Sequence, residues 1–73
     1  MKFAIVTEYY EGSKIDTVYT NKGKGVICQI YINGEKTSEY KVYKVKTDKP
    51  YTRWNGRYFY ISDEYLEALR TVA

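Results

Sequence analysis

Turn-forming residues interrupt this chain about every ten residues, and this spacing limits the length of any regular element. The clearest signals are Asn33-Gly34 and Asn55-Gly56, two dipeptides that favour tight hairpin turns. Between the turns, β-branched and aromatic residues alternate with polar ones, which is typical of strands with one buried face. The pattern predicts five or six short strands, over residues 2–10, 15–20, 25–32, 36–46, 51–54 and 57–61.

The last segment has a helical period instead and predicts one helix over residues 63–72. Ser62 is a favourable N-cap, and Asp63 and Glu64 lie in the first turn, where the helix dipole stabilises negative charge. The apolar residues that follow recur at helical spacing and predict a buried stripe, formed by Tyr65, Leu66, Leu69 and Val72.

These elements predict a mainly β domain, of class β+α, that spans residues 1–73 as a single unit. The candidate architectures are a small antiparallel barrel of the SH3-like or OB-like kind and a strongly twisted sheet. Barrel closure would hide strand edges that a lone sheet leaves exposed. In either case the C-terminal helix would cover an open face or a barrel end. An open meander with the helix across one face is the alternative.

Two details of strand pairing follow from the residue pattern. The run Phe3-Ala4-Ile5-Val6 is apolar on both sides, which is typical of a central strand. A two-residue loop at Asn33-Gly34 would place charged residues opposite the apolar face of residues 26–32, whereas a shift of one residue pairs Val26 with Tyr40 or Val42. We therefore expect an odd-length loop there, with Gly34 in a left-handed, bulged position.

Composition excludes several kinds of site. Cys28 is the only cysteine and there is no histidine, so the chain has neither an internal disulfide nor the usual zinc ligands. Cys28 falls on the apolar face of its strand and is expected to be a core residue. No cofactor or metal is expected. A reducing, cytoplasmic location fits best, with no membrane association, because no stretch has the apolar length of a signal peptide or a membrane span.

One group of basic and aromatic residues surrounds the Asn55-Gly56 turn and is the first candidate binding site. Such residues stack on unpaired bases and contact phosphates, and they also dominate protein-protein interfaces. The competing interpretation is that most of these side chains contribute to the core and to an ordinary surface, with the tryptophan plugging a barrel end. The candidates are Tyr51, Arg53, Trp54, Arg57 and Tyr58, together with Tyr60.

A second, cationic group begins in the glycine-containing loop with Lys22 and Lys24 and continues along the fourth predicted strand and its exit. Lysines on a strand can track phosphates, but they also protect an exposed sheet edge from pairing with other chains. The net charge of +3 is weak for a polyanion binder. The strand and exit lysines are Lys41, Lys44, Lys46 and Lys49.

The sequence favours a binding protein over an enzyme, because no catalytic constellation is evident. The first hypothesis is a protein-interaction module, and a small nucleic-acid-binding barrel is the alternative. Capture of a small ligand such as a nucleotide, at a barrel mouth or an oligomer interface, is a third. In size and tyrosine content (ten tyrosines in 73 residues), the chain resembles accessory proteins of bacteriophages and mobile elements. That resemblance implies a modulator or inhibitor of a larger host protein. Homo-oligomers are compatible with each hypothesis.

Overall fold

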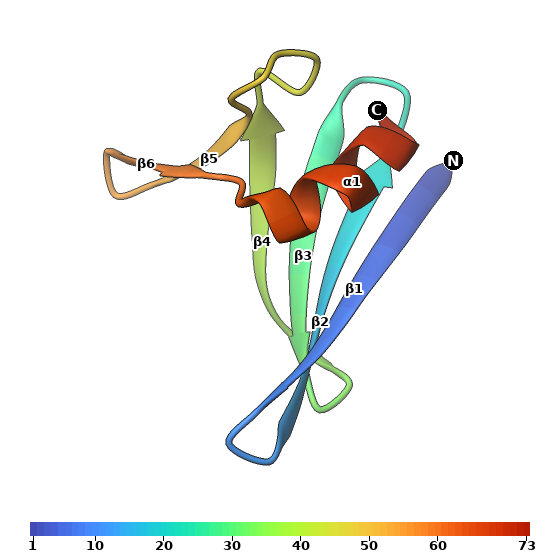
Figure 1. Ribbon diagram of the computed structural model, residues 1–73, viewed down its shortest axis with the longest axis vertical. Helices are drawn as coiled ribbons and strands as arrows, with labels where there is room; N and C mark the ends of the chain where they lie inside the picture. The colour runs from blue at the N-terminus through green and yellow to red at the C-terminus, as the bar shows by residue number, and fades with distance from the viewer.

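The computed structural model describes residues 1–73 as one antiparallel sheet with a helix packed on one side (Figure 1). The sheet is an open meander in which the strand order follows the chain order. The predicted mainly β, β+α class with a C-terminal helix is confirmed. The sheet is not closed into a barrel, so among the predicted arrangements the open meander is the right one. The elements are β1 Lys2–Tyr10, β2 Ser13–Asn21, β3 Val26–Ile32, β4 Glu35–Tyr43, β5 Tyr51–Trp54, β6 Arg57–Tyr60 and α1 Asp63–Val72.

The core lies between α1 and the side of the sheet that faces it. Tyr19 and Cys28 are paired neighbours on β2 and β3, and both are buried, with 2% and 5% of their surface exposed. Leu69 and Val72 of α1 pack on this cluster at 0% and 1% exposure, while Tyr65 and Leu66 are partly buried beside it. The predicted helical stripe and the core position of Cys28 are confirmed.

Both ends of α1 have backbone partners. Ser62 is extended, at φ −74° and ψ 162°, and its carbonyl oxygen accepts the N–H groups of Tyr65 and Leu66. Ser62 is therefore the N-cap, as predicted, although its hydroxyl makes no capping bond. At the other end Asn21 Nδ2 donates to the Val72 carbonyl over 2.7 Å, which satisfies one of the orphan carbonyls of the last turn. At ten residues, α1 is too short to cross a membrane.

β1 lies at the edge of the sheet and not in its centre, so the central position predicted for it is wrong. Ala4 and Val6 face the helix and are partly buried. Phe3 and Ile5 lie on the opposite, helix-free face, where they are 63% and 52% exposed. α1 covers one apolar face of the strand. The apolar side chains on the other face are covered neither by a second layer nor by a further strand.

The β3–β4 hairpin has the predicted register, but a bulge inside β4 produces it and not the loop. Its loop has two residues, Asn33 and Gly34, both with positive φ (51° and 86°), so the expected odd-length loop is wrong. The shift of one residue occurs inside β4, at a bulge at Thr37, whose hydroxyl donates to the Ile30 carbonyl over 3.1 Å. Beyond this bulge Val26 pairs with Val42, which keeps the apolar side chains of both strands on the helix face.

β4 ends at Tyr43, three residues earlier than predicted. Lys44 has a positive φ of 56°, which lies outside the extended region that strand residues occupy. Its carbonyl oxygen accepts both the N–H and the hydroxyl of Thr47, and this turn leads into β5. β5 pairs only with Val42 and Tyr43 of β4, so the outer edge of β4 from Glu35 to Lys41 has no partner strand. Lys41 lies on this free stretch and fits the predicted edge protection. Lys44, Lys46 and Lys49 lie beyond the end of β4, so for them that expectation is wrong.

Candidate functional site

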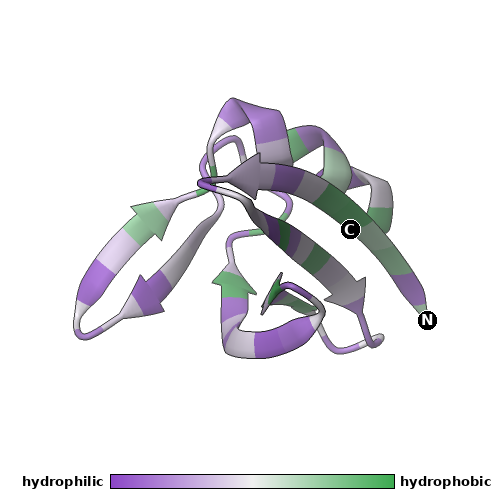
Figure 2. Cartoon of the chain, turned by 90° about the horizontal axis from the view of Figure 1, so that it is seen from below, coloured by the Kyte–Doolittle hydropathy of each residue, from purple (hydrophilic) through white to green (hydrophobic).

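The β5–β6 hairpin stands apart from the two packed layers, as Figures 1 and 2 both show. Its turn is formed by Asn55 and Gly56, with φ values of 54° and 74°, the conformation that a two-residue hairpin turn requires. Two residue pairs connect it to β4, Val42 with Thr52 and Tyr43 with Tyr51. The N–H of Ile61, just after β6, also donates to the Pro50 carbonyl over 3.0 Å.

The hairpin exposes its aromatic side chains. Trp54, Tyr58, Phe59 and Tyr60 are 58%, 52%, 47% and 61% exposed. Every residue of β6 is exposed, so the interpretation in which this strand contributes to the core is wrong. Trp54 plugs no barrel end, because there is no barrel. The aromatic content of the hairpin is therefore not explained by packing inside the domain.

Three tyrosines form a parallel column across β4, β5 and β6, of which Tyr58 is exposed and Tyr43 and Tyr51 are half-buried. Tyr51 lies between Tyr43, at 5.4 Å between ring centroids and 15° between planes, and Tyr58, at 4.5 Å and 3°. Tyr60 meets Tyr51 edge-on at 5.9 Å. Partial removal from water by its neighbours raises the pKa of Tyr51. These contacts hold the rings in one arrangement before any partner binds.

A cation stands at each outer ring of the tyrosine column. Lys41 Nζ lies 5.2 Å from the Tyr43 ring centroid, and Arg53 Cζ lies 5.3 Å from that of Tyr58, both within cation-π range. Tyr51 has a ring against each of its faces and so offers no face to a nucleic-acid base. The column presents ring edges, hydroxyl groups and two positive charges to a partner.

The structure brings together some of the predicted site residues and separates others. Tyr51, Arg53 and Tyr58 share one face of the hairpin, whereas Trp54 and Arg57 form a cross-strand pair on its other face. Tyr43 belongs to the column and was missed by sequence reasoning. The signal that could have found it is the register of β4 against β5, which a sequence without long-range pairing information does not supply.

Lys22 and Lys24 lie in the β2–β3 loop, away from the hairpin. With Lys41 they border an open hollow of about 300 Å³ whose floor is Gly25, Val26 and Ile27. Lys41 also borders a second hollow, shared with Arg53 and Trp54. This lysine therefore links the two cationic groups. The acidic Glu39 lines the second hollow, and hydrogen bonds from Gln29 and Lys36 lower the pKa of its carboxyl group.

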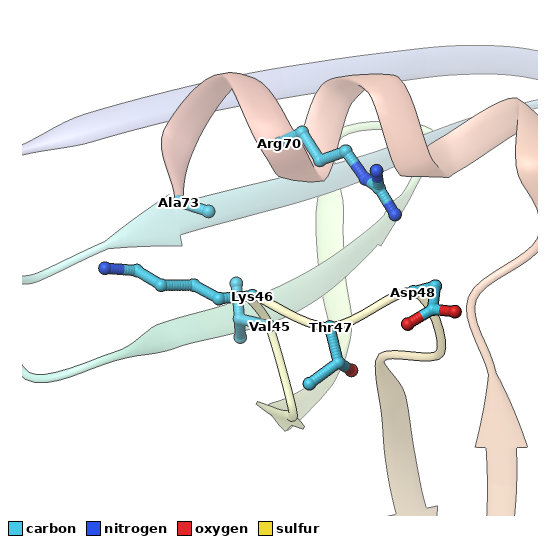
Figure 3. A pocket seen from close by; sticks show the side chains of 6 residues that line it. All are labelled: Val45, Lys46, Thr47, Asp48, Arg70 and Ala73. Atoms are coloured by element: carbon cyan, nitrogen blue, oxygen red, sulfur yellow. The ribbon is translucent and has the colours of Figure 1, made fainter.

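A further hollow of about 310 Å³ lies between the β4–β5 loop and the C-terminal end of α1 (Figure 3). Arg70 and Asp48 point toward the same opening, while the Lys46 side chain extends away from it. Val45, Thr47 and Ala73 complete the wall. The charges here are mixed and all belong to exposed chain segments, so the hollow has no chemical character that selects a ligand.

The ionisable groups inside the fold serve packing. Burial raises the pKa of the Cys28 thiol to about 11 and raises that of the Tyr19 phenol further still. The Tyr65 hydroxyl donates to the Glu8 carboxylate, and this bond raises the pKa of Tyr65 to about 12. No three His, Cys, Asp or Glu side chains lie close enough together to hold a metal ion.

No family model, curated protein or solved structure matches this chain. Its function is therefore inferred from the surface of the molecule.

Proposed function

We propose that this chain is a non-enzymatic protein-interaction module that docks a partner protein through the β5–β6 hairpin. The observation that carries the proposal is the pre-stacked tyrosine column, which ends at the exposed Tyr58, together with the exposed Trp54 on the same projecting hairpin. Tyrosine, tryptophan and arginine are the residue types that contribute most binding energy at protein interfaces. Stacking fixes the rings in advance, so less side-chain entropy is lost on binding than for free side chains.

The ring geometry favours a protein partner over a single-stranded nucleic acid. Base stacking needs an open aromatic face, and both faces of Tyr51 are occupied. The observation in favour of nucleic acid is the cationic hollow bordered by Lys22, Lys24 and Lys41. A docked protein could place carboxylates against the same lysines and Arg53. The resemblance to phage accessory proteins suggests a larger host protein as partner, and the single free thiol, Cys28, fits a cytoplasmic location.

The test compares two exposed aromatic residues on different hairpins. Trp54→Ala removes a ring of the proposed docking surface, and Tyr10→Ala removes a 66% exposed ring from the end of β1. Wild type and both variants are used to capture proteins from a nuclease-treated extract of the source cells. Each captured protein is then purified, and its affinity for the three forms is measured directly.

We expect Trp54→Ala to weaken a direct protein complex by at least about tenfold, with Tyr10→Ala within about twofold of wild type. Equal affinities for the three forms would contradict the proposed docking surface. Titration of short oligonucleotides, followed by the fluorescence of Trp54 as the sole tryptophan, tests the alternative. Tight binding that falls steeply with salt would replace the protein proposal by the nucleic-acid one.

A further inference from the structure

The free edge of β1 is long and unprotected. β1 has nine residues and pairs with β2 without a register break, it contains no proline, and its only lysine is the first residue, Lys2. Sheet proteins commonly protect such an edge with charges, prolines or bulges, because an unprotected edge pairs with another strand. Figure 2 shows that the N-terminal half of this strand is largely apolar. The opposite edge consists of β6, which has four residues and begins with Arg57, and of the part of β4 that β5 leaves unpaired, which carries Lys36 and Lys41.

The hydrogen bonds of Lys14 show which backbone groups of β1 point outward. Its N–H donates to Asn33 Oδ1 over 2.9 Å, and its carbonyl accepts the Asn33 N–H over 2.8 Å, so both groups face the β3 side. Tyr9, the β1 partner of Lys14, therefore directs its own groups to the free edge. By the period of two along a strand, the outward residues are Phe3, Ile5, Thr7 and Tyr9.

We propose that this edge pairs with the β1 edge of a second copy of the chain, antiparallel, with the two-fold axis at Ile5. Ile5 then lies opposite the partner's Ile5, and Phe3 lies opposite the partner's Thr7. These are outward residues, so each pair exchanges two backbone hydrogen bonds. The two sheets join into one that continues across the axis.

Charge and hydrophobic complementarity select this register. Lys2 lies opposite the partner's Glu8, and Ala4 lies opposite the partner's Val6, all on the helix side. Moving the axis to Val6 places Ala4 opposite the partner's Glu8, and moving it to Ala4 places Lys2 opposite the partner's Val6; both moves break the charge pair. The Tyr65 hydroxyl already holds Glu8 on the helix side, where it meets the partner's Lys2.

Dimer formation also covers the apolar side chains that the monomer exposes. Ile5 is 52% exposed and stands beside its cross-strand neighbour Val18 on the helix-free face. In the proposed dimer Val18, Ile5, the partner's Ile5 and the partner's Val18 form one continuous apolar row. Burial of this row provides the driving force, and the backbone bonds provide the register. The β5–β6 hairpin lies at the other end of the sheet and stays exposed, so this proposal is independent of the proposed docking function.

Sedimentation over a wide range of concentrations tests the dimer. Wild type is expected to show a monomer-dimer equilibrium. Ile5→Lys, which sets two lysines against each other at the axis, is expected to raise the dissociation constant by about tenfold or more. Phe59→Lys makes the same kind of apolar-to-lysine change at a 47% exposed position in β6, and it should leave the dissociation constant unchanged. A wild type that stays monomeric throughout, or an Ile5→Lys variant that dimerises as well as wild type, overturns the proposal.

Cysteine crosslinking tests the register, in a Cys28→Ala background whose fold is checked by circular dichroism. Ile5→Cys should form a disulfide-linked dimer, since paired residues of this type have Cα atoms about 5.5 Å apart, within disulfide range. Phe3→Cys alone should not, because its two copies lie about 13 Å apart along the strands. A mixture of Phe3→Cys and Thr7→Cys should crosslink. Crosslinking of Phe3→Cys to itself, or none with Ile5→Cys, overturns the register.

Discussion

The same residue types have opposite roles in two regions of the molecule. One region is the four long strands with their helix, and the other is the short β5–β6 hairpin. Tyr19 in β2 is 2% exposed and forms part of the core, whereas Tyr58 in β6 is 52% exposed and forms part of a surface column. Both are flanked by β-forming residues. The difference is that α1 covers the helix face of β1 and β2 and leaves the hairpin uncovered (Figure 1).

This contrast separates the region that stabilises the fold from the proposed docking surface. The free energy of folding comes mainly from the apolar surface buried between α1 and the sheet, because that is where side chains leave water. The hairpin buries little and can change its side chains at small cost to the fold. We expect mutations in the two regions to separate cleanly into those that unfold the chain and those that alter its surface.

The largest expected effect is that of Leu69→Ala. Leu69 is fully buried, so its truncation leaves a cavity in the core and should lower the free energy of unfolding by about 3 kcal/mol. Phe59→Ala, on the hairpin, should lower it by less than about 1 kcal/mol. Urea denaturation followed by circular dichroism measures both. Equal losses would show that the hairpin is part of the cooperative core.

A second effect concerns alkaline pH and is tested at Cys28 in the core. The folded pKa of Cys28, about 11, lies above its ordinary value of 9.0, so the stability linked to the neutral thiol is complete below pH 9 and is lost as the pH rises toward 11. Urea midpoints across this interval should fall for wild type and fall less for Cys28→Ala. Parallel curves for the two proteins would contradict a buried, neutral thiol.

The two Asn-Gly turns give a matched comparison of smaller effects. Asn33 and Asn55 have nearly the same positive φ, 51° and 54°, but only Asn33 exchanges two hydrogen bonds with Lys14. Asn33→Ala should lower the free energy of unfolding by about 2 kcal/mol, through backbone strain and a lost hydrogen bond. Asn55→Ala should lower it by about 1 kcal/mol or less. Urea denaturation measures both losses. A larger loss for Asn55→Ala than for Asn33→Ala would show that the hairpin stabilises the fold as much as the long strands do.

The smallest effect on global stability is expected for Tyr51→Ala, below about 0.5 kcal/mol, because the hairpin contributes little to the core. Locally the effect should be large, since Tyr51 holds two stacked contacts of roughly 0.5–1.5 kcal/mol each. Amide hydrogen exchange in β5 and β6 should accelerate by about tenfold. Tyr60→Ala, which loses one edge contact, is the control. Similar rates in both variants would show that the column does not order the hairpin.

Sequence reasoning located local features well. The turn dipeptides, the strand alternation and the helical stripe depend on residues near one another in the chain, so β3, β5 and α1 appear within a residue of their predicted bounds. It failed where the outcome depends on distant partners. The apolar run of β1 indicated a central strand, and nothing local shows that β1 would be left with a free edge.

The candidate site shows the same division. The sequence identified most of the aromatic and basic residues around Asn55-Gly56, but it favoured the core for many of them and omitted Tyr43. Exposure depends on where α1 packs, and the tyrosine column depends on the register of β4 against β5. Neither can be obtained from the spacing of residues within one strand.

By itself the sequence determined the number and type of elements, the core role of Cys28 and the mixture of residues on the hairpin, because propensity, periodicity and turn chemistry act over a few residues. Tertiary structure alone decided that the sheet stays open, that Thr37 bulges to align Val26 with Val42, and that β1 keeps a free edge. These outcomes depend on contacts between segments far apart in the chain. Several arrangements have the same local preferences, and small differences in the apolar surface they bury determine which one is stable.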